Sequence, residues 1–160
     1  MKKYIYTFII LMVATSIIPS SASAASVYLE SSKIKMFVGD TAIITIKINA
    51  EGTTLNTIEG NIVLKSTSNS LAVREFSLAS SAFGLWPRTP SLSSDGKTVS
   101  FVGGVPGGFN IEGATLFKII VQANVEGVVT ISPEDVAAFV NDGKGTKLTA
   151  TGRDVVIQVD

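Results

Sequence analysis

Cysteine and histidine are both absent from this 160-residue sequence. Their absence excludes disulfides, thiolate nucleophiles, Ser-His triads, haem and nearly every ligand set that holds zinc or copper. An excess of one charge is missing too, since 13 basic side chains balance 13 acidic ones and the basic ones are scattered. We therefore expect no nucleic-acid partner. Charged residues form 16% of the chain and hydrophobic residues 46%, which excludes a disordered polyelectrolyte.

Long hydrophobic runs are scarce as well, and the one at residues 4–18 lies at the start of the chain. Two lysines precede it, Pro19 ends it, and small residues follow as far as Ala24. This arrangement predicts a secretory signal peptide over residues 1–24, cleaved after Ala24. An uncleaved anchor is the weaker alternative because a membrane-spanning helix needs about 20 apolar residues. We expect residues 25–160 to form one domain that is secreted or held at the cell surface and does not span a membrane.

The rest of the chain has the patterning of β-strands. Apolar Ala42, Ile44, Ile46 and Ile48 alternate with mostly polar neighbours, as a half-buried antiparallel strand requires. Similar segments recur, separated about every 8–12 residues by Gly, Asn, Asp, Ser or Pro. No long window has helical periodicity. The pattern predicts an all-β sandwich or barrel with about nine strands.

Three segments depart from this pattern. Residues 77–92 hold the only tryptophan, Trp86, and two prolines, which argue against a central strand. Residues 103–109 are rich in glycine, which indicates close backbone approach or positive φ. Residues 132–135, Ser-Pro-Glu-Asp, have the features of one short helical turn, with a capping serine and early acidic residues.

Six segments between about residues 26 and 159 carry further motifs, namely residues 38–41 (Val-Gly-Asp-Thr), 56–62, 81–86, 101–104, 113–119 and 141–146. In their order and spacing these segments resemble the cohesin-like domains of secreted bacterial proteins. The resemblance implies a nine-stranded β-sandwich with jelly-roll topology, a fold shared with family 2 and family 3 carbohydrate-binding modules. It also implies a dockerin-like or other surface protein as partner. The Trp86-Pro87 and 103–108 stretches differ from dockerin-binding cohesins and resemble stand-alone cohesin-like proteins.

The resemblance further implies that one sheet face meets the partner. Carried onto this chain, that face would present Asn61, Val63, Lys65, Thr98, Ser100, Val102, Val128 and Thr130. Some apolar residues also fall on the polar parity of their strands, namely Ile43, Val63, Leu116, Ile120, Val128 and Val156. A contiguous apolar patch of this kind is typical of a partner site, although coverage by loops or edge strands is the structural alternative.

Trp86 is the remaining candidate for ligand contact. An exposed indole can stack on a sugar ring, which would make the chain a carbohydrate-binding module that recognises a polysaccharide. The structural alternative is that Trp86, Phe83 and Leu85 plug one end of the sandwich. Carbohydrate binding therefore stays an alternative function, as does a role as a subunit of a surface fibre.

Neither a cofactor nor catalysis is expected. Residues 141–143, Asn-Asp-Gly, could offer oxygen ligands to calcium, but the further carboxylates of a tight loop are missing and a hairpin turn is the better interpretation. The acidic residues lie mostly beside turns, whereas glycoside hydrolysis needs two carboxylates about 5–10 Å apart in a cleft. The sequence thus favours a non-catalytic binding module that acts through protein–protein adhesion or scaffolding.

Overall fold

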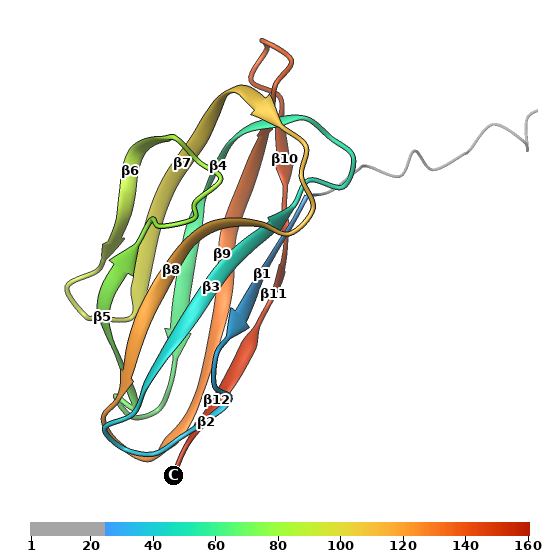
Figure 1. Cartoon of the computed structure of the whole chain (residues 1–160). Helices are drawn as coiled ribbons and strands as arrows, with labels where there is room; N and C mark the ends of the chain where they lie inside the picture. The colour runs from blue at the N-terminus through green and yellow to red at the C-terminus, as the bar shows by residue number, and fades with distance from the viewer. Residues whose placement is uncertain (1–24) are drawn as a thin grey trace, which may run out of the picture.

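The computed structural model describes residues 25–160, so the predicted signal peptide lies outside the described residues. Over this range the chain forms two β-sheets packed face to face, without a helix (Figure 1). The strands are β1 (Ser26–Ser31), β2 (Lys35–Met36), β3 (Thr41–Asn49), β4 (Leu55–Lys65), β5 (Leu71–Ser77), β6 (Leu85–Leu92), β7 (Thr98–Phe109), β8 (Ala114–Ala123), β9 (Gly127–Val140), β10 (Lys147–Thr149), β11 (Thr151–Arg153) and β12 (Val155–Val159).

The first sheet has the order β11-β1-β3-β8-β5, and the second has the order β2-β12-β9-β4-β7-β6 with β10 added beside β9. The predicted all-β jelly-roll sandwich is confirmed. The count of about nine strands is too low, because the described range holds twelve segments. Three of these, β2, β10 and β11, have only two or three residues and are too short to show a periodic pattern.

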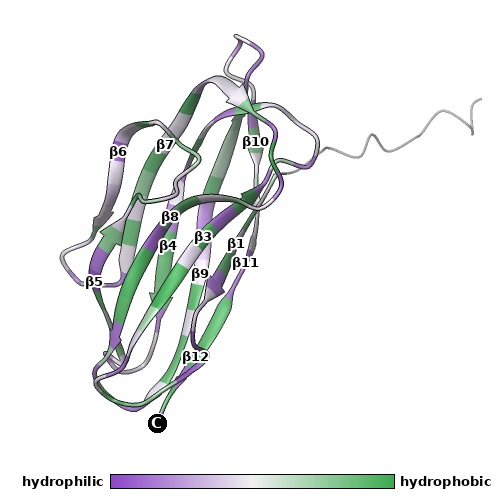
Figure 2. Ribbon diagram, viewed as in Figure 1, coloured by the Kyte–Doolittle hydropathy of each residue, from purple (hydrophilic) through white to green (hydrophobic). Residues whose placement is uncertain are grey.

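The core lies between the sheets and follows the alternation of the sequence. Ile44, Ile46 and Ile48 of β3 are fully buried, and they face Ile58 and Ile62 among other residues from the second sheet. Apolar and polar segments accordingly alternate along the strands in Figure 2. Residues 25–160 thus close one continuous hydrophobic core by themselves.

The predicted helical turn at residues 132–135 is wrong, because these residues continue the central strand β9. Asn61 pairs with Glu134 and Glu59 pairs with Ala137, which leaves two residues of β9 opposite Gly60. One of the two is Asp135, whose φ is +51°. A Cβ on Gly60 would lie 2.9 Å from a methyl group of Val136, so the bulge requires glycine there.

The two irregular segments are also partly strand. β6 contains Pro87 and Pro90 and lies at the edge of its sheet, in agreement with the expectation that it is not central. β7 continues through residues 103–108, but its pairing with β4 is irregular there, since Thr57 pairs with Gly104 and Leu55 pairs with Phe109. Gly107 and Gly108 have φ values of +87° and +80°, so the predicted positive φ is confirmed. A Cβ on Gly103 would lie 2.5 Å from the Phe83 ring and 2.7 Å from the Trp86 ring, which explains why β7 has no side chain at this position.

A second bulge corrects the expected orientation of Leu116. Ile46 pairs with Phe117 and Lys47 pairs with Thr115, so Leu116 is the extra residue of β8. Leu116 and Phe117 are both fully buried. The strict alternation that placed Leu116 on the outer surface fails at the bulge.

All four sheet edges are short or interrupted. β2 has two residues and β11 has three, while β6 carries two prolines. On β5 the pairing with β8 shifts between Val73 and Glu75, so Arg74 is unmatched. Such edges present few backbone groups in a row to an incoming strand.

Candidate functional site

The eight residues predicted to meet a partner lie on one face, the surface of β4, β7 and β9 that points away from the other sheet. We call it the β4 face, and it comprises Asn61, Val63, Lys65, Thr98, Ser100, Val102, Val128 and Thr130. The strand register places these residues side by side, since Val63 pairs with Thr98 and Lys65 pairs with Thr130. The alternate residues Ile62 and Leu64 are buried in the core. The structure therefore brings the predicted set together.

The apolar part of the β4 face lies toward β12, and Val156 of β12 continues it. Val128 and Val156 are each about half exposed. Val156 pairs with Thr130 and Val128 pairs with Gln158, so the two valines are diagonal neighbours across β9 and β12. Val63 on β4 is partly exposed and adds to this apolar surface.

The polar part of the face is organised by two cross-strand pairs. Lys65 Nζ lies 2.5 Å from Glu134 Oε1, and Ser100 Oγ donates a hydrogen bond of 2.8 Å to Asn61 Oδ1. The hydrogen bond that Lys65 donates to Glu134 raises the pKa of Lys65, with a smaller contribution from the negative charge of Asp154. Lys65 is therefore held in its charged form beside the Glu134 side chain.

Sequence reasoning missed two residues of this face, Glu134 and Ser132. Both were assigned to a helical turn. In β9, Ser132 pairs with Val63 and is only 3% exposed, and its hydroxyl has no hydrogen-bond partner within the described residues. The signal that could have found them is the continuation of the β9 alternation past Pro133, which the apparent capping motif obscured.

Two shallow hollows open on the face. One, of about 580 Å³, is lined by Val63, Lys65, Lys97 and Val128 among others. The other, of about 210 Å³, is polar and is lined by Glu59, Asn61, Arg88, Val102 and Asp135 among others. The face is thus gently contoured, with no deep cleft, which suits a partner surface better than a small molecule.

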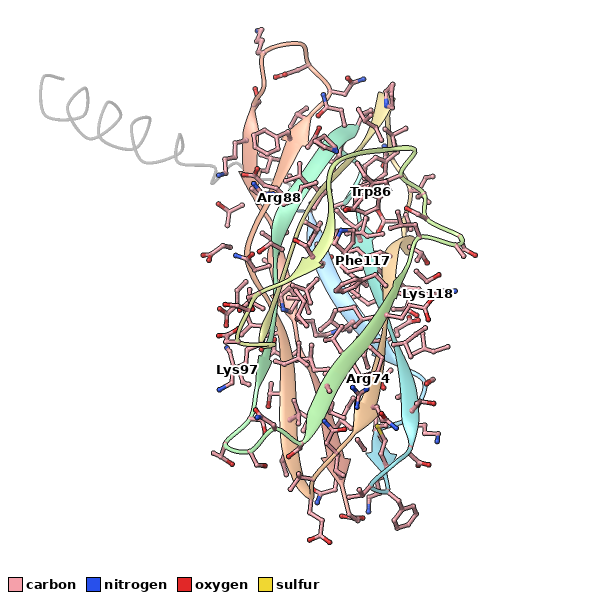
Figure 3. The ribbon with its side chains drawn as sticks, turned by 90° about the vertical axis from the view of Figure 1, so that its left-hand side faces the viewer. Arg74, Trp86, Arg88, Lys97, Phe117 and Lys118 are labelled. Carbon is pink, nitrogen blue, oxygen red and sulfur yellow. The ribbon has the colours of Figure 1, made fainter. Side chains whose placement is uncertain are left out.

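Trp86 lies between the sheets rather than on the β4 face (Figure 3). Its ring meets that of Phe117 nearly edge-on with centroids 6.0 Å apart, and the Phe83 ring is 5.7 Å away. The side chain is partly buried and packs against the core. This packing accounts for the indole as part of the plug considered above, and its role as a ligand contact stays a prediction.

The turn at residues 141–146 is held by its own side chain. Asp142 accepts a backbone hydrogen bond of 2.8 Å from Lys144 and a further bond from the Thr146 hydroxyl, and these bonds lower the pKa of Asp142. Among residues 25–160, no three acidic side chains gather in a way that could hold a metal ion. The same part of the chain has no apolar helix of membrane-spanning length.

Comparison with known proteins gives matches in structure only. No protein-family model matches the sequence, and no curated protein matches it. Among solved structures, the cohesin module of a family 33 glycoside hydrolase from Clostridium perfringens is similar at a TM-score of 0.67 and 9% identity, over 86% of this chain and 98% of that one. The seventh ScaB type I cohesin of Pseudobacteroides cellulosolvens is similar at a TM-score of 0.65 and 17% identity, over 86% and 92%.

A third similar structure is the third ScaB cohesin of R. flavefaciens, solved in complex with a group 1 dockerin. It has a TM-score of 0.62 and 11% identity, over 89% of this chain and 99% of that one. The three structures are covered almost completely, so the likeness extends over the whole module. The chain has the cohesin fold, and the resemblance seen in the sequence is confirmed at that level.

Proposed function

We propose that this chain, with its cohesin fold, is an exported, non-catalytic module that binds a protein partner on the β4 face. The observation that carries the proposal is the composition of that face. Exposed valines lie beside an ion pair and a hydrogen-bonded Asn61–Ser100 pair, all on rigid strands of one sheet. Surfaces that combine exposed apolar side chains with ordered polar groups are typical of protein recognition.

The structural neighbours agree with a protein partner. The R. flavefaciens cohesin was solved with a dockerin, as were two cohesins from Clostridium thermocellum. A dockerin-like chain or another surface protein is therefore the kind of partner proposed here. None of the eight β4-face residues is aromatic, whereas glycan-binding faces stack sugar rings on aromatic side chains, so the proposal names a protein and not a polysaccharide.

Recognition would use a surface that is formed before the partner arrives. The side chains of the β4 face project from hydrogen-bonded strands above a close-packed core, so docking orders few groups and loses little conformational entropy. Val63, Val128 and Val156 would bury apolar area. Lys65 and Glu134 could exchange their mutual contact for charged groups of the partner, which would provide specificity.

Export is part of the proposal and rests on the amino-terminal sequence. Residues 1–24 serve as the signal peptide, and residues 25–160 are the cohesin-like domain that works outside the cell or at its surface. The lack of cysteine means that the folded domain needs no oxidative step after export.

The test is partner capture by immobilised residues 25–160 from an envelope extract, with bound proteins identified by mass spectrometry. We expect Val63→Asp combined with Lys65→Glu to abolish capture, because the pair of changes puts a charge into the apolar area and reverses the central cation. Far-ultraviolet circular dichroism should stay unchanged, since neither side chain is buried in the core.

A matched control makes the same chemical changes on the other sheet. Ile43→Asp with Lys118→Glu alters a partly exposed isoleucine and a lysine on the outer surface of β3 and β8, which are neighbouring strands. This variant should capture the same proteins as the unmodified domain. Equal capture by both double variants would contradict the assignment of the β4 face.

A further inference from the structure

Four exposed apolar side chains gather at one end of the sandwich, away from the centre of the β4 face. They are Ile34 (65% exposed), Phe37 (71%), Val38 (55%) and Val125 (50%), and we call them the end patch. Phe37 is the most exposed large hydrophobic residue in the described part of the chain. Because aromatic side chains bury about 150–250 Å² on contact, Phe37 alone offers substantial apolar area.

Backbone hydrogen bonds bring these residues together. The β12 residue Gln158 donates to the carbonyl of Ile34, and Val38 donates to the carbonyl of Asp160, at 2.9 and 3.3 Å. Gly39 donates to the carbonyl of Ala123 at 2.8 Å, two residues before Val125. The end patch thus surrounds the end of the sandwich at which β2, β12 and the carboxyl terminus meet (Figure 1).

The turn that presents Phe37 is braced. Asp40 accepts a bond from the Phe37 backbone N–H at 3.3 Å, and the Asp40 N–H donates back to the Phe37 carbonyl at 2.9 Å. Lys33 Nζ lies 3.2 Å from the same carboxylate. A large apolar side chain held outward by a fixed turn is preorganised for contact and loses little entropy on burial.

The charges around the end patch have both signs. Lys35 and Glu126 make no ion pair within residues 25–160, and Asp160 adds a second acidic side chain. Interfacial lipid binding instead relies on a surplus of Lys and Arg beside the apolar residues. A second copy of this chain offers the complementary arrangement, since a two-fold contact places the same apolar centre and the same mixed rim on both sides.

We propose that the end patch joins two copies of this chain about a two-fold axis. Phe37 of each copy packs on the end patch of the other, and Lys35 faces the acidic Glu126 and Asp160 across the contact. The β4 faces remain free, so the dimer presents two partner sites and gains avidity on a surface that carries many partners.

The contact is small compared with a standard protein interface of about 1,200–2,000 Å², so the dimer should be weak. We expect a dissociation constant in the micromolar range or above, which is reached where many copies share one surface. The proposal is independent of the β4-face function, because the two sets of residues do not overlap.

The experiment is sedimentation velocity on residues 25–160 from about 10 µM to about 1 mM, a range that brackets weak association. The domain should shift from monomer to dimer with concentration. Phe37→Ser should raise the dissociation constant at least about tenfold, the effect of losing a buried aromatic anchor. Lys35→Glu should also raise it, since the new carboxylate would face Glu126 and Asp160 of the other copy.

The matched control is Ile111→Ser, which removes a side chain of similar exposure (52%) in the loop before β8. This variant should dimerise like the unmodified domain. Trp86 fluorescence confirms folding of each variant, because the indole packs against the core. A domain that stays monomeric up to about 1 mM, or equal dimerisation of the Phe37 and Ile111 variants, overturns the proposal.

Discussion

The outer surfaces of the two sheets differ, although both sheets bury their inward-facing apolar side chains in the same core. On the β11-β1-β3-β8-β5 sheet the long polar side chains bind one another. Arg74 donates to Gln122 and Asn124, Lys47 pairs with Glu30 at 2.8 Å, and Arg153 lies over the Tyr28 ring. The β4 face has fewer such ties and keeps exposed valines between them. The inward face of a strand is constrained by the core, so the choice of outward residues carries the functional signal.

The first prediction tests whether the two sheets act as one folding unit. Phe117 of β8 meets Phe101 of the opposite sheet at 5.0 Å between centroids and Trp86 at 6.0 Å. Phe117→Ala should lower the free energy of unfolding by about 3–5 kcal/mol, the cost of a large cavity in a core. Urea unfolding should show one transition by both circular dichroism and Trp86 fluorescence. Two separate transitions would mean that the sheets, and so their faces, are independent.

The second prediction concerns the β9 bulge opposite Gly60, which lies in the sheet that carries the β4 face. Gly60→Ala should cost about 1–3 kcal/mol, because the new Cβ meets Val136 in a close-packed region. It should also weaken partner capture, since Glu59 and Asn61 flank the change. Gly84→Ala is the control, as a Cβ there has no neighbour within 4 Å. Urea midpoints that move equally for both variants would show that the bulge is not constrained.

The third prediction concerns the pH dependence of stability that arises from aspartates in the turns and not from the sheet faces. Hydrogen bonds lower the pKa values of three aspartates in turns. The largest contribution comes from the Phe37 backbone N–H for Asp40, from the Ser93 hydroxyl for Asp95 and from the Thr146 hydroxyl for Asp142. A folded-state pKa below the unfolded value of about 3.8 adds stability above that pH, and the stability is lost as the pH falls through the folded pKa. Urea midpoints should therefore drop in acid, and Asp142→Asn should flatten that drop.

At neutral pH the same Asp142→Asn variant should be slightly less stable than the unmodified domain. Partner capture at neutral pH should be unaffected, because this turn lies outside the β4 face. A steeper acid dependence in the variant would contradict the assigned role of the carboxylate.

The smallest expected effect compares the two surface ion pairs. Glu30 raises the pKa of Lys47 and Glu134 raises that of Lys65. A raised lysine pKa adds stability that is complete below the unfolded value of about 10.5 and is lost as the pH rises through the folded value. Both pairs are exposed, so Lys47→Met and Lys65→Met should each shift the urea midpoint only slightly. Partner capture should weaken with Lys65→Met and stay unchanged with Lys47→Met. Weaker capture by the Lys47→Met variant would contradict the assignment of partner binding to the β4 face.

The sequence predicted the two-sheet architecture because alternation is a direct consequence of burial on one side. Ala42, Ile44, Ile46 and Ile48 all lie in the core as expected. Two of the failures lie at bulges. One extra residue in β8 turned Leu116 inward, and just before the extra residue of β9 the Ser-Pro-Glu-Asp sequence has the local appearance of a helix start. At both bulges, pairing with neighbouring strands overrides the local conformational propensity. The paired residues are far apart in the sequence, so no local pattern indicates the pairing.

The predicted face was assembled correctly in space for the same reason. Residues of one parity on β4, β7 and β9 must share a surface once the strands are neighbours, as Asn61 and Ser100 do. Glu134, the partner of Lys65, has the same parity as Val128 and Thr130, but it was missed because residues 132–135 resemble the start of a helix. The end patch also escaped notice, because its residues come from two segments far apart in the sequence, residues 34–38 and Val125.

The interrupted sheet borders have a consequence for how densely the module can be displayed. Two prolines in β6 and the unmatched Arg74 in β5 deny a neighbouring molecule the continuous row of backbone donors and acceptors from which cross-β stacking grows. Many copies can therefore be held at high local concentration without fusing into insoluble ribbons.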